Sequence, residues 1–120
     1  MFIALDFDGT VVYDDFPNIG KDIGAIPVLK KLVKNKHKLI LNTMRSGKSL
    51  DAAIKWFKDN DIPLFGINKN PIQSKWTTSP KVYAHIYIDD KSLGIPLVYD
   101  DNPYVDWKKV KKLLKNNGIL

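Results

Sequence analysis

Two pairs of carboxylates in the sequence each follow a short apolar segment. Asp6 and Asp8 come directly after the apolar residues 2–5, and Asp89 and Asp90 come after a second apolar run. Carboxylate oxygens are the ligands that Mg²⁺ prefers in proteins, and Mg²⁺ shares its remaining positions with water and substrate phosphate. If the two segments are strands of one parallel sheet, the four side chains meet at its carboxyl edge. The sequence therefore predicts a magnesium site there.

The first pair also has a purely structural explanation, because turns that follow strands favour Asp and Gly. Gly9 permits the bend that lets Asp6 and Asp8 face one crevice. A structural explanation must account separately for each of four carboxylates at strand ends, whereas a bound cation accounts for all of them together. We therefore favour the metal site.

The pattern of apolar residues predicts the elements that position these side chains. Strands are expected at residues 2–5, 38–43, 64–67 and 85–88, with 97–99 as a candidate fifth. Helices are expected over 25–36, through 50–57 and from 107 to 114, where apolar residues recur at helical spacing. Alternation of this kind favours an α/β fold whose parallel sheet is covered by helices on both faces. The 120 residues have room for one domain, residues 1–120.

The motifs together carry a resemblance to a known family. Asp6-Phe7-Asp8-Gly9-Thr10, then Thr43 after a strand, then Lys81, then Asp89-Asp90 resembles the haloacid dehalogenase (HAD) superfamily, in this order and across most of the chain. The resemblance implies a three-layer α/β/α Rossmann-like fold with strand order 5-4-1-2-3. It also implies a magnesium-dependent reaction that passes through a phosphoaspartate.

The resemblance implies a role for each matched residue. Asp6 would attack phosphorus, and Asp8 would act as general acid and then general base, with its backbone carbonyl on the metal. Thr43 and Lys81 would bind the phosphoryl group. Asp89 would hold the metal, with the neighbouring Asp90 as a further ligand or as its hydrogen-bonding partner. An acid at position 8 favours a phosphatase over the ATPases of the superfamily, which tend to carry threonine there.

Three assignments have competing interpretations. Lys75 is the alternative to Lys81 as the motif lysine. Arg45 is the only arginine among 19 basic residues and stands two positions after Thr43, so it is either a bidentate clamp on phosphate or a partner in a surface salt bridge. Trp76 either touches the substrate or covers an edge of the sheet.

The composition narrows the partners and the location. The net charge of +6 is concentrated in lysine clusters over 30–38 and 108–115, which are either solvated helix faces or a nucleic-acid surface. There is no cysteine and no apolar run long enough to span a membrane, so we expect a cytoplasmic protein without membrane contact. The start of the chain lacks the features of a signal peptide.

The lengths of two connections bear on substrate access. HAD enzymes carry cap domains in segments that correspond to residues 11–20 and 66–80 here, and these leave room only for a small flap and for a loop with one turn of helix. We therefore expect an open site and a phosphomonoesterase acting on a phosphorylated small molecule or a nucleic-acid 3′-phosphate end. The alternative is a phosphate- or nucleotide-binding regulatory module with little turnover.

Overall fold

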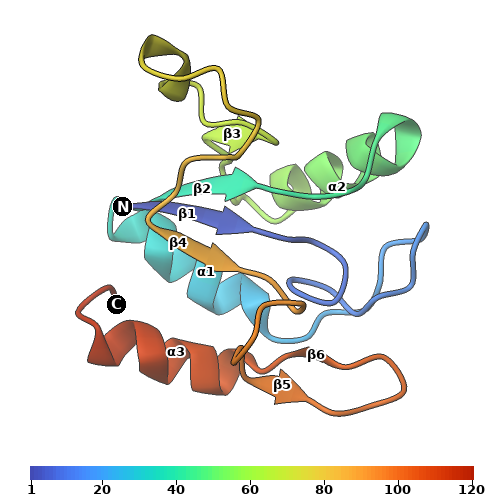
Figure 1. The fold of residues 1–120 in the computed structure, drawn as a ribbon. Helices are drawn as coiled ribbons and strands as arrows, with labels where there is room; N and C mark the ends of the chain where they lie inside the picture. Colours follow the sequence, from blue (N-terminus) through green and yellow to red (C-terminus); the bar gives the residue numbers. More distant parts are fainter.

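Four short parallel strands form the central sheet of the computed structural model, which describes residues 1–120 (Figure 1). The strands are β1 (Phe2–Leu5), β2 (Lys38–Leu41), β3 (Gly66–Ile67) and β4 (Ile86–Ile88). Their order across the sheet is β3-β2-β1-β4, and every neighbouring pair is parallel. The predicted α/β class and parallel sheet are thereby confirmed, with an observed order of 4-1-2-3.

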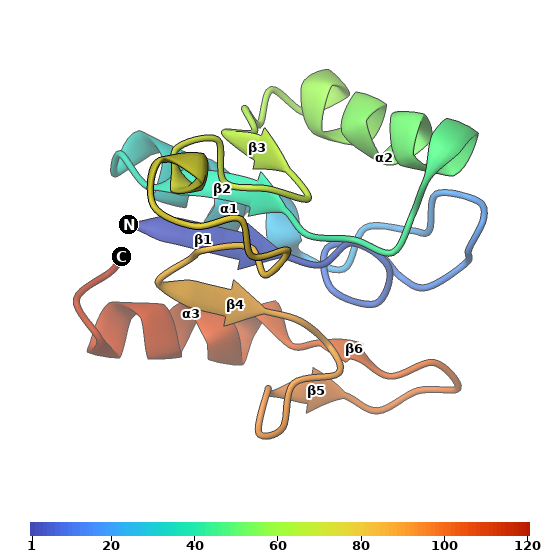
Figure 2. The ribbon, with the colours of Figure 1, turned by 45° about the horizontal axis from the view of Figure 1, so that its top comes forward.

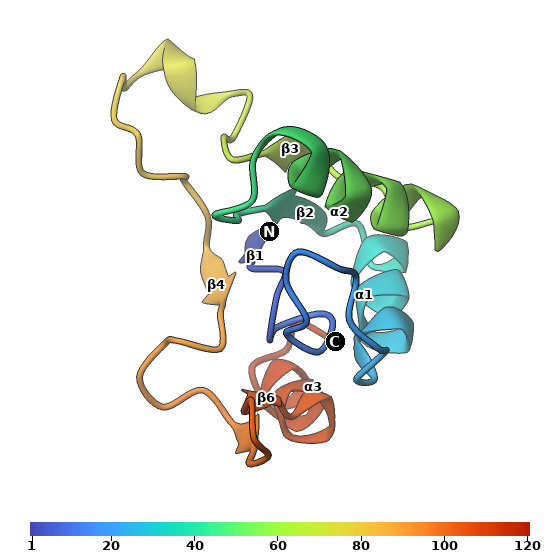
Figure 3. The same cartoon turned by 90° about the vertical axis from the view of Figure 1, so that its right-hand side faces the viewer.

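The α-helices are α1 (Ala25–Lys34), α2 (Gly47–Asp59) and α3 (Trp107–Asn116), all within a few residues of the predicted ranges. Their buried residues join one cluster with Ile3, Leu5, Leu39 and Leu41, which alternate along β1 and β2 and so point to the same face of the sheet. Viewed along the strands, α1 and α3 lie on this side of the sheet (Figure 3). None of these helices has the length and apolar composition of a membrane span.

The opposite face lacks the helical layer that was predicted. A small cluster of Ala4, Ile40 and Val82 occupies it, covered by the segment 68–85 (Figure 2). This segment contains one three-residue 3₁₀ helix, η1 (Gln73–Lys75), in agreement with the expected loop and single turn. Its backbone is held by side chains in place of a helix: the buried Gln73 amide donates to Ser79 and Lys81 carbonyls and accepts from the Tyr83 N–H.

The fifth strand of the predicted 5-4-1-2-3 order is not in the central sheet. Residues 97–98 do form a strand, β5 (Leu97–Val98), but it pairs antiparallel with β6 (Tyr104–Val105) in a separate two-stranded sheet. A parallel partner for β4 would need a crossover of about a dozen residues. The connection from β4 to β5 spans only residues 89–96, and the chain pairs locally instead.

The start of α3 is fixed to the loop that follows β1. The Asp106 carboxylate accepts hydrogen bonds from the N–H groups of Lys108 and Lys109, a helix cap that stabilises by about 1 kcal/mol. The buried Trp107 indole donates to the carbonyl of Thr10 at 2.7 Å. The last helix therefore holds the loop that carries the predicted site.

Candidate active site

The register of β1 and β4 brings Asp6 and Asp89 to the same end of the sheet. Leu5 pairs with Ile88, and the Asp6 N–H donates to the Ile88 carbonyl at 3.0 Å, so the residue that follows each strand leaves the sheet at the same level. Carboxylate oxygens of Asp6, Asp89 and Asp90 lie within 4.8 Å of one another. Three of the four predicted carboxylates therefore converge on one point.

Thr10 links two of these carboxylates and was not predicted as a site residue. Its hydroxyl lies 3.2 Å from both Asp6 Oδ2 and Asp90 Oδ1, and it accepts the Asp90 N–H at 3.0 Å. The residue is fully buried, so this contact network holds both carboxylates in place. The only sequence signal was its position as a polar residue closing the Asp6–Thr10 motif.

Gly9 is the residue that allows Asp90 to come this close. Its φ of +77° lies in the left-handed region, which costs a residue with a Cβ about 1–2 kcal/mol. A Cβ at Gly9 would also stand 2.6 Å from Asp90 Oδ2 and 2.9 Å from its Cγ. The bend predicted for Gly9 is confirmed, and the glycine is required twice, for its backbone angle and for this contact.

Burial and the neighbouring carboxylates together raise the pKa of Asp6 to about 8. Burial is the largest cause, followed by the hydrogen bond to Asp90 and the negative charge of Asp89. Three acids in this space repel one another when all are ionised, and a divalent cation offsets that repulsion. The donor set is also one that Mg²⁺ accepts, since all of its members are carboxylate oxygens. The residues thus fit the predicted ion.

The Asp8 side chain points to Arg45 and does not join the other three carboxylates. Its side chain pairs with Arg45 through two hydrogen bonds, Nε to Oδ2 at 2.8 Å and Nη2 to Oδ1 at 2.7 Å. It is therefore absent from the convergent group, although it was predicted to bind the metal. Its backbone carbonyl accepts no hydrogen bond, which leaves that oxygen free for the metal contact that the family resemblance implies.

Arg45 is buried in the protein and is not a surface residue. Besides the bonds to Asp8, its guanidinium donates to the carbonyls of Pro17, Asn18 and Ser49, so all five of its N–H groups have protein acceptors. The surface salt bridge considered from the sequence is thus wrong. The alternative, a clamp on phosphate, requires Arg45 to give up one of these bonds. As observed, it ties Asp8, the segment after β1 and the first turn of α2 together.

Thr43 lies beyond the carboxyl end of β2, as predicted. Its N–H donates to the Asn68 side chain at 2.8 Å, and its hydroxyl oxygen accepts the Arg45 N–H at 3.1 Å. The hydroxyl hydrogen has no protein acceptor and remains available to a phosphoryl oxygen. Asn68, which follows β3, is a second positioning residue that the sequence did not indicate.

The two candidate lysines make no ion pair in the structure. Lys81 Nζ lies 5.7 Å from the centroid of the Tyr87 ring, and Lys75 is exposed at the end of η1. The lysine beside the carboxylates is Lys91, whose Nζ is 3.8 Å from Asp90 Oδ2 with a side chain that is 88% exposed. Its sequence signal was its position directly after Asp90, and it is a third candidate for the motif lysine.

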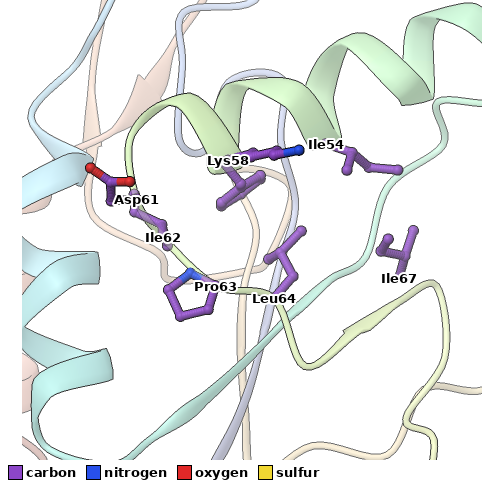
Figure 4. A pocket seen from close by; sticks show the side chains of 8 residues that line it. Ile54, Lys58, Asp61, Ile62, Pro63, Leu64 and Ile67 are labelled. Atoms are coloured by element: carbon purple, nitrogen blue, oxygen red, sulfur yellow. The ribbon is translucent and has the colours of Figure 1, made fainter.

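The site does not coincide with the hollow of about 480 Å³ between α2 and β3, which is drawn in Figure 4. Ile54, Leu64 and Ile67 line this hollow, with Lys58 and Asp61 at its rim, and none of the converging carboxylates takes part. The candidate site at the carboxyl edge of the sheet is therefore distinct from this hollow.

Comparison with known proteins identifies one related solved structure among its matches. No protein-family model and no curated protein matches the chain. A solved structure does: the conserved protein coded by a locus of Bacteroides thetaiotaomicron is 35% identical, covers 98% of this chain and 91% of its own, and superposes with a TM-score of 0.82. The chain belongs to the family of this Bacteroides protein. The likeness spans nearly the whole of both chains, so the fold described above is that of the family.

Membership in the Bacteroides family carries no activity with it. What the site can do follows from its own geometry, which has no domain inserted between β1 and α1 or between β3 and β4. No inserted domain therefore covers the carboxylate cluster.

Proposed function

We propose that this protein is a magnesium-dependent phosphomonoesterase of the HAD type, with Asp6 as nucleophile. The observation that supports the proposal most is the convergence of Asp6, Asp89 and Asp90 within 4.8 Å, with burial and the neighbouring carboxylates raising the pKa of Asp6 to about 8. Such a group of acids is costly without a cation and well suited to one. Asp6, Asp89 and Asp90, with the carbonyl of Asp8, are the residues that would hold Mg²⁺. Bound there, Mg²⁺ supplies charge neutralisation between carboxylate and phosphate.

The proposed first step belongs to Asp6. One of its oxygens attacks phosphorus while the bond from phosphorus to the leaving oxygen breaks, which gives a phosphoaspartate and an alkoxide that takes a proton from Asp8. Thr10 holds the Asp6 carboxylate through its hydroxyl, and the free hydroxyl hydrogen of Thr43 is available to a phosphoryl oxygen. Lys81, Lys75 or Lys91 would balance the remaining charge.

The second step would use Asp8 as base. Water attacks phosphorus, Asp8 takes a proton from the water, and phosphate leaves as Asp6 is restored. Because Arg45 binds both oxygens of Asp8, the carboxylate is held in one orientation, which suits a base. Its use as an acid in the first step requires that one of these hydrogen bonds open when substrate binds.

The lack of a cap domain is consistent with a broad range of phosphate-ester substrates. Neither the segment after β1 nor the segment 68–85 holds a cap, so a phosphorylated small molecule or the 3′-phosphate end of a nucleic acid would reach the carboxylates. The lack of cysteine in the sequence supports a cytoplasmic location for this reaction.

One observation favours a second candidate, a phosphate- or nucleotide-binding regulatory module with little turnover. The general acid of the proposed mechanism is engaged by a buried guanidinium whose five N–H groups are all in use. If this pair does not open, phosphate binds at the edge of the sheet and the ester is not cleaved.

Hydrolysis of p-nitrophenyl phosphate, with and without Mg²⁺, separates these functions. We expect turnover with Mg²⁺, none in EDTA, and loss of at least about a thousandfold in kcat for Asp6→Asn, since the nucleophile is removed. Asp51→Asn, at an exposed acid of α2, is the matched control and should keep full activity. Phosphate binding without turnover on any ester would favour the regulatory module. Equal activity in Asp6→Asn would refute both the nucleophile and the mechanism.

A further inference from the structure

The face of the sheet that lacks helices carries a row of aromatic rings. Phe2 begins β1, and its ring centroid lies 5.4 Å from Phe65, 5.7 Å from Tyr83 and 5.5 Å from His85, on which it stacks with an interplanar angle of 6°. Tyr83 continues the row to Trp76 at 5.3 Å. Five rings therefore lie in contact across one surface, contributed by β1, Phe65 and the segment 68–85.

The rings at one end of the row are open to solvent. Trp76 is 62% exposed and Tyr87 is 41% exposed, and both line a hollow of about 220 Å³ with Tyr83 and Lys81. Contiguous exposed apolar surface often marks a site of interaction. In the view of Figure 2 the segment 68–85 that contributes Trp76 and Tyr83 comes forward over the strands.

Cations stand over the same rings. Lys38 Nζ lies 5.1 Å from the Phe65 centroid, and Lys81 Nζ lies 5.7 Å from that of Tyr87. Beside Phe65 a second hollow, of about 300 Å³, is lined by Lys36, His37 and Lys38. No carboxylate lines either hollow, and none of these lysines is ion-paired. Both hollows are therefore lined by cations that no carboxylate neutralises.

We propose that this aromatic row, Phe65-Phe2-His85-Tyr83-Trp76 with Tyr87, is a binding surface for single-stranded nucleic acid. Unpaired bases stack on exposed aromatic rings, and lysines beside the rings contact the phosphates between the bases. A double helix would present phosphates but keep its base faces covered, and an acidic peptide would match the lysines but not the rings. The combination of rings and unpaired cations fits single strands best.

The surface shares only Lys81, one of three lysines that could balance charge at the carboxylates, with the proposed active site. Phe2 and Lys38 are the first residues of β1 and β2, whereas Asp6 and Asp89 follow the last residues of their strands. Binding to the row therefore does not depend on the proposed hydrolysis, and it can be measured in EDTA, where no phosphatase reaction takes place. Failure of one proposal leaves the other standing.

Fluorescence anisotropy with two labelled single strands of equal length and charge tests the inference. One strand is oligothymidylate and the other is the same backbone without bases. We expect oligothymidylate to bind at least tenfold more tightly in EDTA, because stacking contributes only when bases are present. Trp76→Ala should weaken oligothymidylate binding by about tenfold and leave binding of the abasic strand unchanged. Tyr99→Ala, at a ring that is 82% exposed near β5, is the matched control and should have no effect.

The lysines are tested by salt dependence. Lys38→Gln with Lys81→Gln should reduce the slope of log affinity against log salt by about 1.4, since each phosphate contact on a single strand contributes about 0.7. Lys109→Gln with Lys112→Gln, both exposed on α3, should leave the slope unchanged. Circular dichroism checks that the variants remain folded.

Several results would overturn the inference. Equal affinity for the two strands would show that charge alone drives binding. An equal loss in Tyr99→Ala, or a larger change in the α3 lysine variant, would locate binding elsewhere. Competition by polyglutamate as strong as that by oligothymidylate would assign the surface to an acidic peptide.

Discussion

Substitution of Gly9 by alanine is the perturbation for which the structure gives the clearest expectation. The backbone angle at Gly9, φ +77°, disfavours alanine by about 1–2 kcal/mol. The added Cβ would stand 2.6 Å from Asp90 Oδ2, and ordinary contact begins at 3.4 Å, so the carboxylate must retreat by 3.4 − 2.6 = 0.8 Å. Metal ligands tolerate displacements of about 0.2 Å. Gly9→Ala should therefore lose stability and metal affinity together.

Gly118→Ala is the matched control. Gly118 has a similar angle, φ +72°, but no atom lies within 4 Å of the position of its Cβ. It should lose the same 1–2 kcal/mol of unfolding free energy, a fall of roughly 4–8 °C in Tm for a chain of this size. Its affinity for Mg²⁺ should equal that of the wild type. The difference between the two variants isolates the contact with Asp90.

The assay combines chemical denaturation in EDTA with calorimetric titration of Mg²⁺. For Gly9→Ala we expect a loss of stability at least as large as that of Gly118→Ala and a Kd for Mg²⁺ that rises by at least about tenfold. Equal Mg²⁺ affinity in Gly9→Ala, Gly118→Ala and the wild type would refute the argument. It would mean that Asp90 is not among the ligands, or that the loop adjusts without moving it.

Three further perturbations have defined outcomes. Because the pKa of Asp6 is raised, the folded state binds more protons than the unfolded state between about pH 4 and pH 8, and the contribution of Asp6 to stability falls as pH rises through that window. Mg²⁺ needs the ionised carboxylate, so it should raise Tm more at pH 8 than at pH 6. A larger effect at pH 6 would contradict the assignment. Arg45→Met should lower the unfolding free energy, measured by urea denaturation, by about 3 kcal/mol, because Asp8 and the buried carbonyls lose their partner. Lys55→Met, which removes the exposed pair with Asp59, should change it by less than about 1 kcal/mol. Thr10→Val should weaken Mg²⁺ binding in a calorimetric titration and Thr10→Ser should largely restore it, since the serine keeps the hydroxyl between two carboxylates; equal affinities would count against this role.

The sheet and the meeting of distant acids were accessible from sequence because they follow from local rules. Apolar runs that alternate with helical periodicity predict parallel strands, and residues that follow parallel neighbouring strands emerge at one edge. Asp6 and Asp89 are 83 positions apart and still meet for this reason. The Leu5–Ile88 register then sets their level.

Two features of the fold could not be predicted from the sequence: the absence of helices on one face of the sheet and the position of the fifth strand. The pattern of alternation predicts cover on both faces, but it does not say which connection lacks a helix. Residues 66–80 were expected to form a loop with a single turn, and this connection does contain the single turn η1. That expectation already conflicted with a second helical layer. Residues 97–98 are a strand, as predicted, yet strand pattern does not reveal the partner, which is the nearby β6.

The roles of Arg45 and Thr10 depend on contacts between distant segments. The rarity of arginine in this chain indicated that Arg45 is special, but its partner Asp8 is 37 residues away and its other acceptors are backbone carbonyls, which carry no sequence signature. Thr10 acts through one hydroxyl placed between two acids, and many threonines in turns have no such role. Contacts of this kind emerge only when the fold is known.

Covalent capture of phosphorus on Asp6 tests the central claim most directly. The protein is mixed with radiolabelled acetyl phosphate and quenched in acid, and the labelled peptide is identified after digestion. We expect a single label on Asp6 that forms only with Mg²⁺ and is absent from Asp6→Asn. Hydroxylamine should remove it, because hydroxylamine cleaves acyl phosphates. Label on another residue, or label that forms equally in EDTA, would contradict the account, as would turnover of acetyl phosphate without any label on Asp6.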